Sequence, residues 1–484
     1  MHKASHGRYL QRLVLLALIV QACVSAAPCV QAATEQEVVR TIDQALADPA
    51  LKHGLQGVVV RSLKDGRTIY DKNKDLIFIP ASNFKLLVSA ASLAKFGPDY
   101  RFRTELYTNG EITPEGVLKG DVILVGRGNP ILKPSELQLM ADKLEGIKVI
   151  EGNIVGDDTW FDEIRLGWGW NWDDEPYYYS AQLSALCLNK NVVDVYVRPG
   201  VKVGAKPIVR VDPGTSYMVV QNDAVTTKAG SDKTVSVDRL RGRNVIRVTG
   251  NVPLDYKSES PEEAITMEEP TLFAVTVLKE MLQRSGTEVK GKPVRGPKPE
   301  SAVLVASHQS VPMSEMLKLL NKPSDNLIAE TLLKALGAEF KGRGSSSRGA
   351  EVEMEFLKEA GLDMTAISIV DGSGLARMNY ISPHNLATLL AYMYRHKDSK
   401  VYLDSLPIAG VDGTLRSRMK GTSAAANCRA KTGYISRVRT LSGYVTTKGG
   451  EPLVFSILMN HHLCSSAEVN AIQDKIVTAL AEMR

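Results

Sequence analysis

Hydrophobic positions alternate with polar ones in two short runs near the start of the chain and in three near its end. Residues 57–63 and 67–71 predict two strands, which a hairpin turn joins at Lys64-Asp65-Gly66. Residues 428–434, 439–446 and 453–459 predict three further strands, and residues 466–482 predict a closing helix. We expect the five strands to share one sheet, although a long stretch of chain separates the two groups.

Apolar residues recur with helical spacing in several other segments. Residues 34–46 predict an amphipathic helix, and the same spacing returns at residues 313–320, 326–336, 348–360 and 383–394. The segment after Ile79-Pro80-Ala81-Ser82 is apolar on nearly every face until Gly97-Pro98 ends it. Such a helix should run through the interior of a domain.

The stretch from about residue 98 to 300 has a different texture. It contains short runs typical of strands, punctuated by Gly, Pro, Asn and Asp, at residues 102–107, 117–125, 193–197, 208–211, 234–238 and 245–249. One segment, residues 134–144, predicts a helix there. We therefore predict a split α/β (α+β) domain of residues 33–97 and 301–484, with a β-rich insertion of one or two domains at 98–300.

The first 32 residues predict a secretory signal peptide. Three basic residues precede an apolar run at 13–20, and small residues follow at 24–26 and 30–32. The apolar run is too short to span a bilayer, and cleavage after Ala26 or Ala32 fits the pattern. A membrane anchor, a buried helix and acylation at Cys23 are the alternatives. Export would place the mature chain in the periplasm, the cell envelope or the extracellular medium.

Composition narrows the function classes. An apolar share of 44% with 23% charged residues over 484 residues is that of a globular protein, neither polytopic in the membrane nor disordered. Residues 1–32 hold three basic and no acidic residues, so the net charge of +5 falls to +2 without them, and a nucleic-acid partner loses its support. No long apolar segment follows the final strand, so no integral membrane anchor is predicted.

The cysteines and histidines predict no metal site. Without the leader, Cys187, Cys428 and Cys464 remain, which allows at most one disulfide and gives no zinc-type spacing. All three fit small buried apolar residues as well as they fit a disulfide. No phosphate-binding loop is present, so no cofactor is expected, and the oligomeric state stays open.

Ser82 and Lys85 are the first candidates for catalysis. Their i, i+3 spacing puts both side chains on one helix face, and a lysine among apolar neighbours has a lowered pKa and can act as a base for the serine hydroxyl. The spacing alone is weak, because Ser92 with Lys95 and Ser417 with Lys420 share it. An exposed lysine near a helix start fits it equally well.

Two further motifs change this interpretation. Ser324-Asp325-Asn326 follows a proline before a helix, and Lys431-Thr432-Gly433 lies on a predicted strand. Serine–lysine, Ser-Asp-Asn and Lys-Thr-Gly in this order are the motif set of penicillin-interacting serine enzymes.

Chemistry assigns a role to each motif residue. Ser82 would be the acyl-accepting nucleophile and Lys85 its base, while Ser324 would relay a proton to the leaving amine. Asn326 would orient the substrate amide and Lys85, and Lys431 would supply positive charge near the substrate carboxylate. Thr432 would hydrogen-bond that carboxylate, Gly433 would let the substrate backbone approach, and the N–H groups of Ser82 and Tyr434 would stabilise the oxyanion.

With these motifs the sequence resembles the three-domain D-alanyl-D-alanine carboxypeptidases/endopeptidases, the class C low-molecular-mass penicillin-binding proteins of the penicillin-binding protein 4 type. Ser324 follows Ser82 by 242 residues, far more than a compact β-lactamase allows. The resemblance covers almost the whole mature chain. It implies a β-lactamase/transpeptidase-like domain, a sheet flanked by helices, with two nested inserted domains, at about 98–131 with 222–300 and at 132–221.

The resemblance also implies a pocket for the donor side chain, built from Asp174, Tyr179, Leu375 and Arg377. In the family this side chain ends in the amine and carboxylate of a diamino acid, which an acid and an arginine would suit. Asp174 could equally be solvated in an acidic loop, Tyr179 could be a packing residue, and Asp371-Gly-Ser-Gly before Arg377 could be a plain turn. Trp168, Trp170 and Trp172 could form a carbohydrate platform or pack in a small β domain.

The function that follows is a D-alanyl-D-alanine carboxypeptidase acting on peptidoglycan peptides, with endopeptidase activity and inhibition by β-lactams. A β-lactamase is one alternative, but Ala185 and Leu317 stand where a Glu-x-x-Leu-Asn motif would need glutamate. A non-catalytic peptidoglycan-binding protein of the same fold is the other. Tyr434 departs from the family, which commonly has a hydroxyl residue after Lys-Thr-Gly to hold the substrate carboxylate, so substrate preference stays open.

Overall fold

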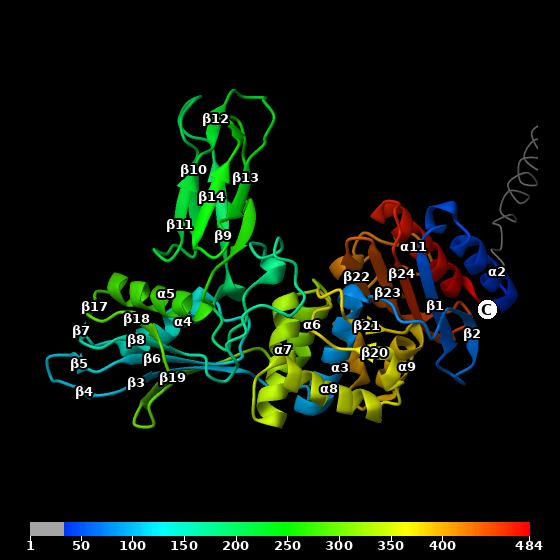
Figure 1. Cartoon of the computed structure of the whole chain (residues 1–484), viewed down its shortest axis with the longest axis horizontal. Coiled ribbons are helices and arrows are strands. Elements are labelled where there is room, and N and C mark those ends of the chain that lie inside the picture. The colour runs from blue at the N-terminus through cyan, green and yellow to red at the C-terminus, as the bar shows by residue number, and fades with distance from the viewer. Residues whose placement is uncertain (1–32) are drawn as a thin grey trace, which may run out of the picture.

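The computed structural model describes residues 33–484 and centres on a five-stranded antiparallel sheet (Figure 1). Its strands come from both ends of the chain, as the sequence pattern predicts. In spatial order they are β2 (Thr68–Lys72), β1 (Leu55–Ser62), β24 (Pro452–Asn460), β23 (Val438–Thr446) and β22 (Arg429–Ile435). β22 is therefore an edge strand, and it carries Lys431.

Helices cover both faces of this sheet, which explains why β23 and β24 are buried almost throughout. Alternate side chains of β24 enter different cores: Phe455 and Ile457 pack with α2 (Glu35–Leu46) and α11 (Ser466–Glu482), whereas Val454 and Leu458 pack with the other helices. Those helices are α3 (Lys85–Phe96), α6 (Met313–Asn321), α7 (Asn326–Lys341), α8 (Ser346–Glu359), α9 (Pro383–Arg395) and α10 (Ser399–Ser405). A two-stranded ribbon of β20 (Ile367–Ser368) and β21 (Tyr380–Ile381) lies among them.

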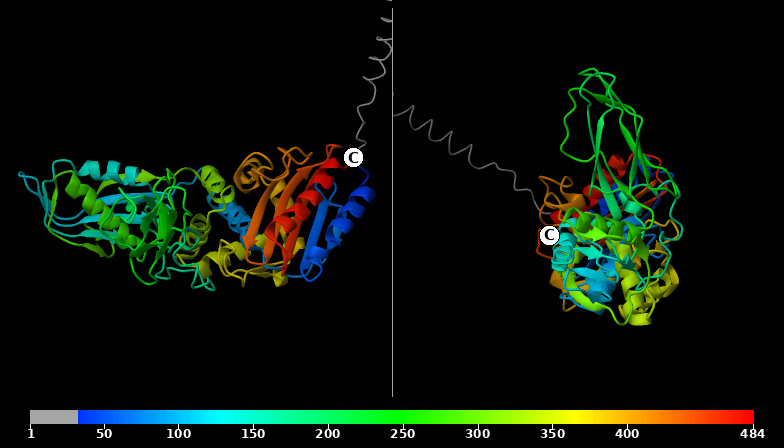
Figure 2. Two further views of the ribbon diagram at one scale, coloured as in Figure 1. Left: turned by 90° about the horizontal axis from the view of Figure 1, so that it is seen from above. Right: turned by 90° about the vertical axis from the view of Figure 1, so that its left-hand side faces the viewer.

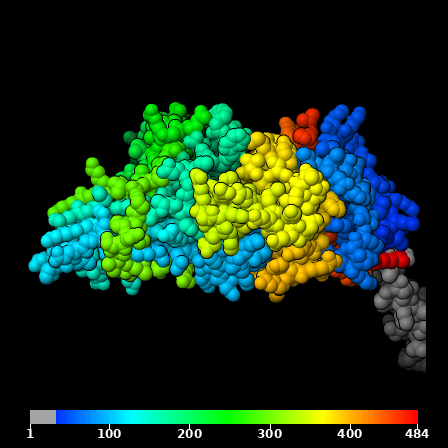
Figure 3. Space-filling view, turned by 60° about the horizontal axis from the view of Figure 1, so that its bottom comes forward, coloured from blue at the N-terminus to red at the C-terminus, as the bar shows by residue number. Residues whose placement is uncertain are grey.

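α3 runs through the interior, as its apolar sequence predicts, and every residue from Lys85 to Leu93 is buried. On the face seen in Figure 3, the helical residues near 340–390 lie between the insertion and the first strands of the sheet.

The insertion has two parts, which we name by their order along the chain. The outer part, residues 103–157 and 270–309, encloses the inner part, residues 192–266, in the sequence. The outer part consists of two sheets with two helices. The larger sheet has the order β18 (Pro293–Arg295), β8 (Ile154–Asp157), β6 (Val122–Arg127), β3 (Arg103–Thr108) and β19 (Val303–Gln309). The smaller has the order β17 (Glu288–Val289), β7 (Val149–Ile150), β5 (Val117–Lys119) and β4 (Glu111–Ile112). The helices are α4 (Pro134–Ala141) and α5 (Pro270–Arg284).

The inner part of the insertion projects from the rest of the molecule, as Figures 1 and 2 show. It has two three-stranded sheets. The first has the order β10 (Ile208–Asp212), β9 (Val192–Arg198) and β16 (Glu263–Thr266). The second has the order β11 (Val219–Asn222), β14 (Val245–Thr249) and β13 (Ser236–Arg239). A short pair, β12 (Val225–Thr227) and β15 (Asn251–Pro253), completes it.

These sheets divide the chain differently from the expected ranges of 132–221 and of 98–131 with 222–300. β7 and β8 belong to the outer sheets and α4 packs against α5 in the same part, whereas the inner strands run from 192 to 266. β19 pairs with β3, so the outer part continues past residue 300 to Gln309. The sequence interpretation also missed α5, because it assigned no element after residue 249 in a region that it expected to be β-rich. Pro270 at the first turn and Phe273, Val277 and Met281 on one face mark the helix.

The remaining local predictions concern the leader and the cysteines. The predicted signal peptide, residues 1–32, lies outside the described residues. Cys187, Cys428 and Cys464 are all free, and the first two are buried. Within residues 33–484, no helix combines the length and the apolar character that crossing a bilayer requires.

One buried acid marks a weak point of the fold. Glu353 of α8 is 1% exposed, and neither of its carboxyl oxygens has a hydrogen-bond partner among the described residues. Burial, and then the nearby Glu330 and Asp371, raise the pKa of Glu353 well above its ordinary value. Burial therefore favours the neutral form of this carboxyl group in the folded protein.

We expect Glu353→Met to stabilise the protein at neutral pH. A carboxyl whose pKa is raised by folding binds its proton more tightly in the folded state, so the free energy of unfolding falls as the pH rises above the ordinary pKa. An apolar side chain of similar length removes that loss and the unsatisfied polar atoms, a gain of about 1–2 kcal/mol. Urea unfolding at pH 4 and pH 8 measures it; a gain no larger at pH 8 than at pH 4, or one matched by exposed Glu359→Met, would contradict this origin.

Candidate active site

Ser82 lies in a single 3-10 turn, Ala81–Phe84, directly before α3. Lys85 is the first residue of α3. Ser82 and Lys85 therefore lie on either side of the boundary between the 3-10 turn and α3, and they do not share the first α-helical turn. Two glycines let the neighbouring chain approach this turn. A Cβ on Gly374 would lie 2.0 Å from the Ala81 carbonyl oxygen, and one on Gly433 would lie 2.7 Å from that of Pro80.

Lys85 is completely buried and makes three polar contacts. Its Nζ lies 2.9 Å from Ser82 Oγ, 2.6 Å from Asn326 Oδ1 and 2.6 Å from the Ser373 carbonyl oxygen. Burial lowers the pKa of Lys85 to about 8, against the opposing effect of Asp371, Glu330 and Asp325. A fraction of about one tenth is therefore unprotonated at pH 7, beside the serine hydroxyl.

The Ser-Asp-Asn and Lys-Thr-Gly motifs meet on the other side of Ser82. Ser324 has a φ of 69°, which turns the chain before α7, and its Oγ accepts a hydrogen bond of 2.8 Å from Lys431 Nζ. Asp325 caps α7 by accepting from the Ile328 N–H at 3.0 Å. Lys431 is buried, and burial followed by the Lys85 charge holds its pKa well below the ordinary value.

These groups surround one cavity of about 470 Å³. Nine of the predicted site residues line it, namely Ser82, Asp174, Tyr179, Ser324, Asn326, Leu375, Arg377, Thr432 and Tyr434. Lys85, Lys431 and Gly433 do not line it: the two lysines lie beneath it, and Gly433 faces the Pro80–Ala81 backbone. The space beside Gly433 is thus occupied by the turn that carries Ser82. We expected the substrate backbone to lie there.

The insertion supplies one wall of the cavity. Asn326 Nδ2 donates to the Tyr179 carbonyl oxygen at 2.7 Å, which ties the loop of residues 171–179 to α7. The Tyr179 hydroxyl donates to Asp174 Oδ1 at 2.9 Å, and Asn171 donates to Asp174 Oδ2 at 3.1 Å. Burial, then this hydrogen bond to Asp174, raise the pKa of Tyr179. Across the cavity, Arg377 donates to the Ser436 carbonyl oxygen at 2.5 Å.

Comparison with known proteins places this geometry in a family. The model of the D-Ala-D-Ala carboxypeptidase 3 (S13) family matches residues 38–483. The chain belongs to this family. The D-alanyl-D-alanine carboxypeptidase of Actinomadura sp. (strain R39) is 37% identical over 490 residues, which is 97% of this chain and 90% of that protein. The D-alanyl-D-alanine carboxypeptidase DacB of Haemophilus influenzae is 28% identical over 425 residues, or 85% and 86% of the two chains.

Solved structures confirm the fold expected from the motifs. The crystal structure of penicillin binding protein 4 (dacB) from Haemophilus influenzae superposes with a TM-score of 0.79 at 26% identity, over 90% of this chain and 97% of that one. A structure of that protein complexed with a β-lactam gives a TM-score of 0.73 at 24% identity, over 90% and 98% of the chains. The protein is accordingly a serine-type D-alanyl-D-alanine carboxypeptidase with a β-lactamase/transpeptidase-like fold.

Two buried acids of this carboxypeptidase escaped the sequence interpretation as site groups. Glu330, on the second turn of α7, accepts from the N–H groups of Gly372 and Ser373 at 2.8–3.1 Å. Asp371 accepts from the N–H groups of Gly374 and Ala376 and from the Trp170 indole. The Asp371-Gly-Ser-Gly segment is thus a turn held by carboxylates, and it presents the Ser373 carbonyl oxygen to Lys85.

Thr414 was also missed. It lines the cavity, and its Oγ1 accepts from Thr432 Oγ1 at 2.7 Å. A single threonine after a glycine gives no sequence signal of such a role. The Tyr434 side chain is 65% exposed, with the Arg439 guanidinium 3.5 Å from its ring centroid. Among residues 33–484, no cluster of His, Cys, Asp or Glu could hold a metal ion.

The negative charge of Glu330 should raise the pKa of Lys85. Burial, and then Asp371, raise the pKa of Glu330 to about 7, so Glu330 is mostly ionised at the pH where Lys85 titrates. Glu330→Gln removes a negative charge that favours the ammonium, and the pKa of Lys85 should fall below 8. NMR of ¹³Cε-labelled lysine follows the titration. An unshifted Lys85 resonance, or the same shift in exposed Glu359→Gln, would refute the coupling.

Proposed function

We propose that this carboxypeptidase removes the terminal D-alanine of peptidoglycan stem peptides through an acyl-enzyme on Ser82. The observation that carries the proposal is the buried, deprotonatable Lys85 amine 2.9 Å from Ser82 Oγ. A serine hydroxyl is a weak nucleophile until a base accepts its proton. In α3 the lysine meets that need, because desolvation favours its neutral form and Asn326 holds its position.

In the first step, Ser82 Oγ attacks the penultimate D-alanine carbonyl carbon while Lys85 takes the hydroxyl proton. The oxyanion faces the backbone N–H groups of Ser82 and Tyr434, our expected donors. The C–N bond then breaks, and the proton that Lys85 took passes through Ser324 to the leaving amine, which leaves Lys85 neutral again; Ser324 lies between the cavity and Lys431. Water hydrolyses the ester in the second step, with Lys85 again serving as the base.

Lys431 and Thr432 would recognise the terminal carboxylate. Without a substrate, burial disfavours the Lys431 ammonium. An arriving carboxylate restores the charged form, since an opposite charge nearby favours it. Thr432, already hydrogen-bonded to Thr414, offers a hydroxyl at the cavity wall. The Tyr434 ring is stacked against Arg439 and takes no part in holding the carboxylate, while its backbone N–H is an expected donor to the oxyanion.

Asp174 and Arg377 would bind the two ends of a zwitterionic donor side chain. Both line the cavity, and no ion pair joins them or ties either to another described residue. Asp174 keeps lone pairs beyond its bonds to Tyr179 and Asn171, and Arg377 uses one nitrogen on Ser436. Stem peptides joined through a diamino acid would present the same groups, so we extend the proposal to endopeptidase cleavage of cross-links. Such substrates require export of the chain to the cell envelope.

The two other functions lack structural support of this kind. In a β-lactamase of class A, a glutamate activates the deacylating water, but Ala185 and Leu317 hold those positions and both are fully buried. A non-catalytic wall-binding protein would have no need of a buried lysine with a lowered pKa beside a serine.

A labelled penicillin should acylate Ser82. The β-lactam carbonyl is attacked as the peptide carbonyl would be, and peptide mapping of the adduct identifies the residue. Ser82→Ala should lose the adduct and lower D-alanine release at least about a thousandfold. Ser417→Ala is the matched control, because Ser417 has a lysine at the same spacing. An adduct elsewhere, or full labelling of Ser82→Ala, would end the proposal.

The side-chain pocket makes a separate prediction. Asp174→Asn and Arg377→Gln should each lower kcat/KM about 10- to 100-fold for a donor that ends in a free amine and carboxylate, the size of one lost charge-assisted hydrogen bond. A donor with both groups capped should show little change. Asp173→Asn, an exposed acid of the same loop, serves as the control. Equal losses in Asp173→Asn would mean that the loop is merely solvated.

A further inference from the structure

A second cavity lies at the junction between the catalytic helices and the insertion. It has a volume of about 600 Å³ and is lined by Asp99, Tyr100, Arg101, Arg103, Glu105, Arg127, Trp160, Gln309 and Glu339. No lining residue is shared with the catalytic cavity. Glu339 is in the last turn of α7 and Asn326 is the first residue, so about 20 Å of helix separates the two cavities.

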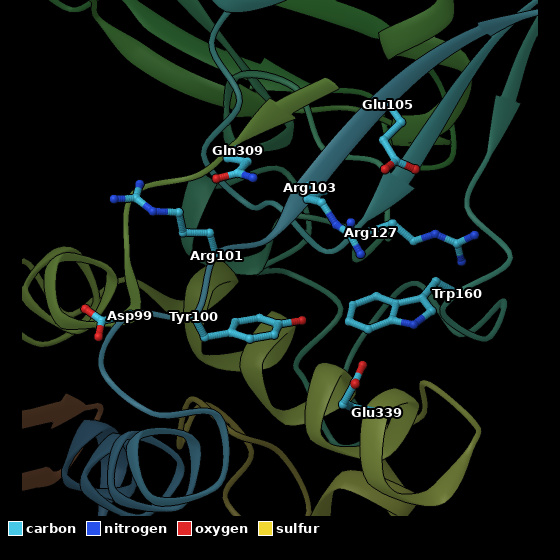
Figure 4. A pocket seen from close by; sticks show the side chains of 9 residues that line it. All are labelled: Asp99, Tyr100, Arg101, Arg103, Glu105, Arg127, Trp160, Gln309 and Glu339. Carbon is cyan, nitrogen blue, oxygen red and sulfur yellow. The ribbon is translucent and has the colours of Figure 1, made fainter. Parts of the chain in front are cut away.

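One wall of this junction cavity is a row of side chains across the outer sheet. Arg103 of β3 is directly opposite Gln309 of β19 on one side and Arg127 of β6 on the other. The three residues share one face, and Figure 4 shows Arg103 and Arg127 projecting into the same space. Facing like charges destabilise an antiparallel pair, yet neither arginine forms an ion pair with a described residue.

The other walls combine rings with acids. Trp160 is stacked on Phe161 and faces Tyr100 across the cavity (Figure 4). Burial, then Glu339, raise the pKa of Tyr100 to about 12, so its hydroxyl remains a donor. Asp99, Glu105 and Glu339 form no ion pair with the three arginines, and Arg101 is turned away, donating to the Ser310 carbonyl oxygen at 2.8 Å. Glu105 accepts a hydrogen bond from the Tyr107 hydroxyl at 3.0 Å, and charges of both signs thus stand around the cavity without an ion pair among them.

The junction cavity continues into a neighbouring one. Arg127 and Trp160 also line a cavity of about 480 Å³, together with residues 159, 161–164, 338 and 342–344. The two spaces meet at the arginine and the indole. An extended ligand fits this shape better than a single small anion does.

We propose that the junction cavity binds a second segment of the wall polymer, a saccharide–peptide with free carboxylates. The Arg103 and Arg127 forks would hold a carboxylate, Trp160 and Tyr100 would contact a sugar ring, and Glu105 and Glu339 would accept from amino or hydroxyl groups. The choice of ligand rests on the proposed function, whereas the unpaired arginine row does not. A wall polymer bound in the junction cavity would stay close to Ser82 between successive hydrolysis reactions.

Binding tests the cavity independently of catalysis. In full-length Ser82→Ala protein, calorimetry with a disaccharide–tetrapeptide should show about tenfold weaker binding at one site after Arg103→Gln with Arg127→Gln. The same muropeptide with amidated carboxylates should bind the unsubstituted cavity as weakly. Arg284→Gln, which removes one positive charge from α5, should change nothing. Thermal unfolding should show the arginine variants to be at least as stable, because repulsion is relieved.

Activity separates this inference from the proposed function. With Ser82 intact, the arginine variants should release D-alanine from a short pentapeptide at the wild-type rate and from intact sacculi several-fold more slowly. Unchanged muropeptide affinity in the double variant, an equal loss in Arg284→Gln or equal affinity for the amidated probe would overturn the junction site. Failure of the wild type to release any D-alanine would instead refute the Ser82 chemistry and leave the binding result standing.

Discussion

The burial of one ammonium group beneath a serine hydroxyl is the constraint on which the rest of the structure depends. Removing a charge from water costs several kcal/mol, and Lys85 recovers part of this from three polar contacts. Each contact comes from a different segment: the turn before α3, the start of α7 and the turn at residues 371–376. Because the contacts must be simultaneous, those segments have little freedom of position.

The surrounding structure holds these three segments in place. α3 is buried by helices on one face of the sheet, and Gly374 and Gly433 let the neighbouring turn and the edge strand close onto Ala81 and Pro80. Glu330 and Asp371 bind the backbone of the 371–376 turn from beneath. The insertion joins the same network where Asn326 donates to Tyr179 and where Lys334 pairs with Asp162 at 2.6 Å. It is therefore part of the catalytic surroundings and not an appendage.

The sequence predicts what is encoded locally. Most helices of the catalytic domain and the five strands of the split sheet follow from apolar spacing, although α7 extends to Lys341 beyond the predicted 336 and α10 was not predicted. Three short motifs in order identify the family, because each residue type has a chemical reason to be there. The nested boundaries do not follow, since strands that read alike along the chain belong to different sheets according to pairing at long range, as β8 and β9 do. α5 was missed because the region that contains it was expected to be β-rich and residues 270–284 received no assignment of their own. Glu330 and Thr414 act through neighbours distant in sequence, which no local pattern reveals.

The split sheet has a consequence for the order in which the enzyme comes into being. β1 lies inside the sheet and pairs with β24, with Val59 opposite Ser456. During synthesis the first strands wait, with an open edge, until almost the whole polypeptide has been made. Lys431 likewise reaches Ser324 only once β22 to β24 are in place. A chain that lacks its last three strands therefore lacks one of the three motifs, and the cavity around Ser82 is complete only when both ends of the polypeptide share the sheet.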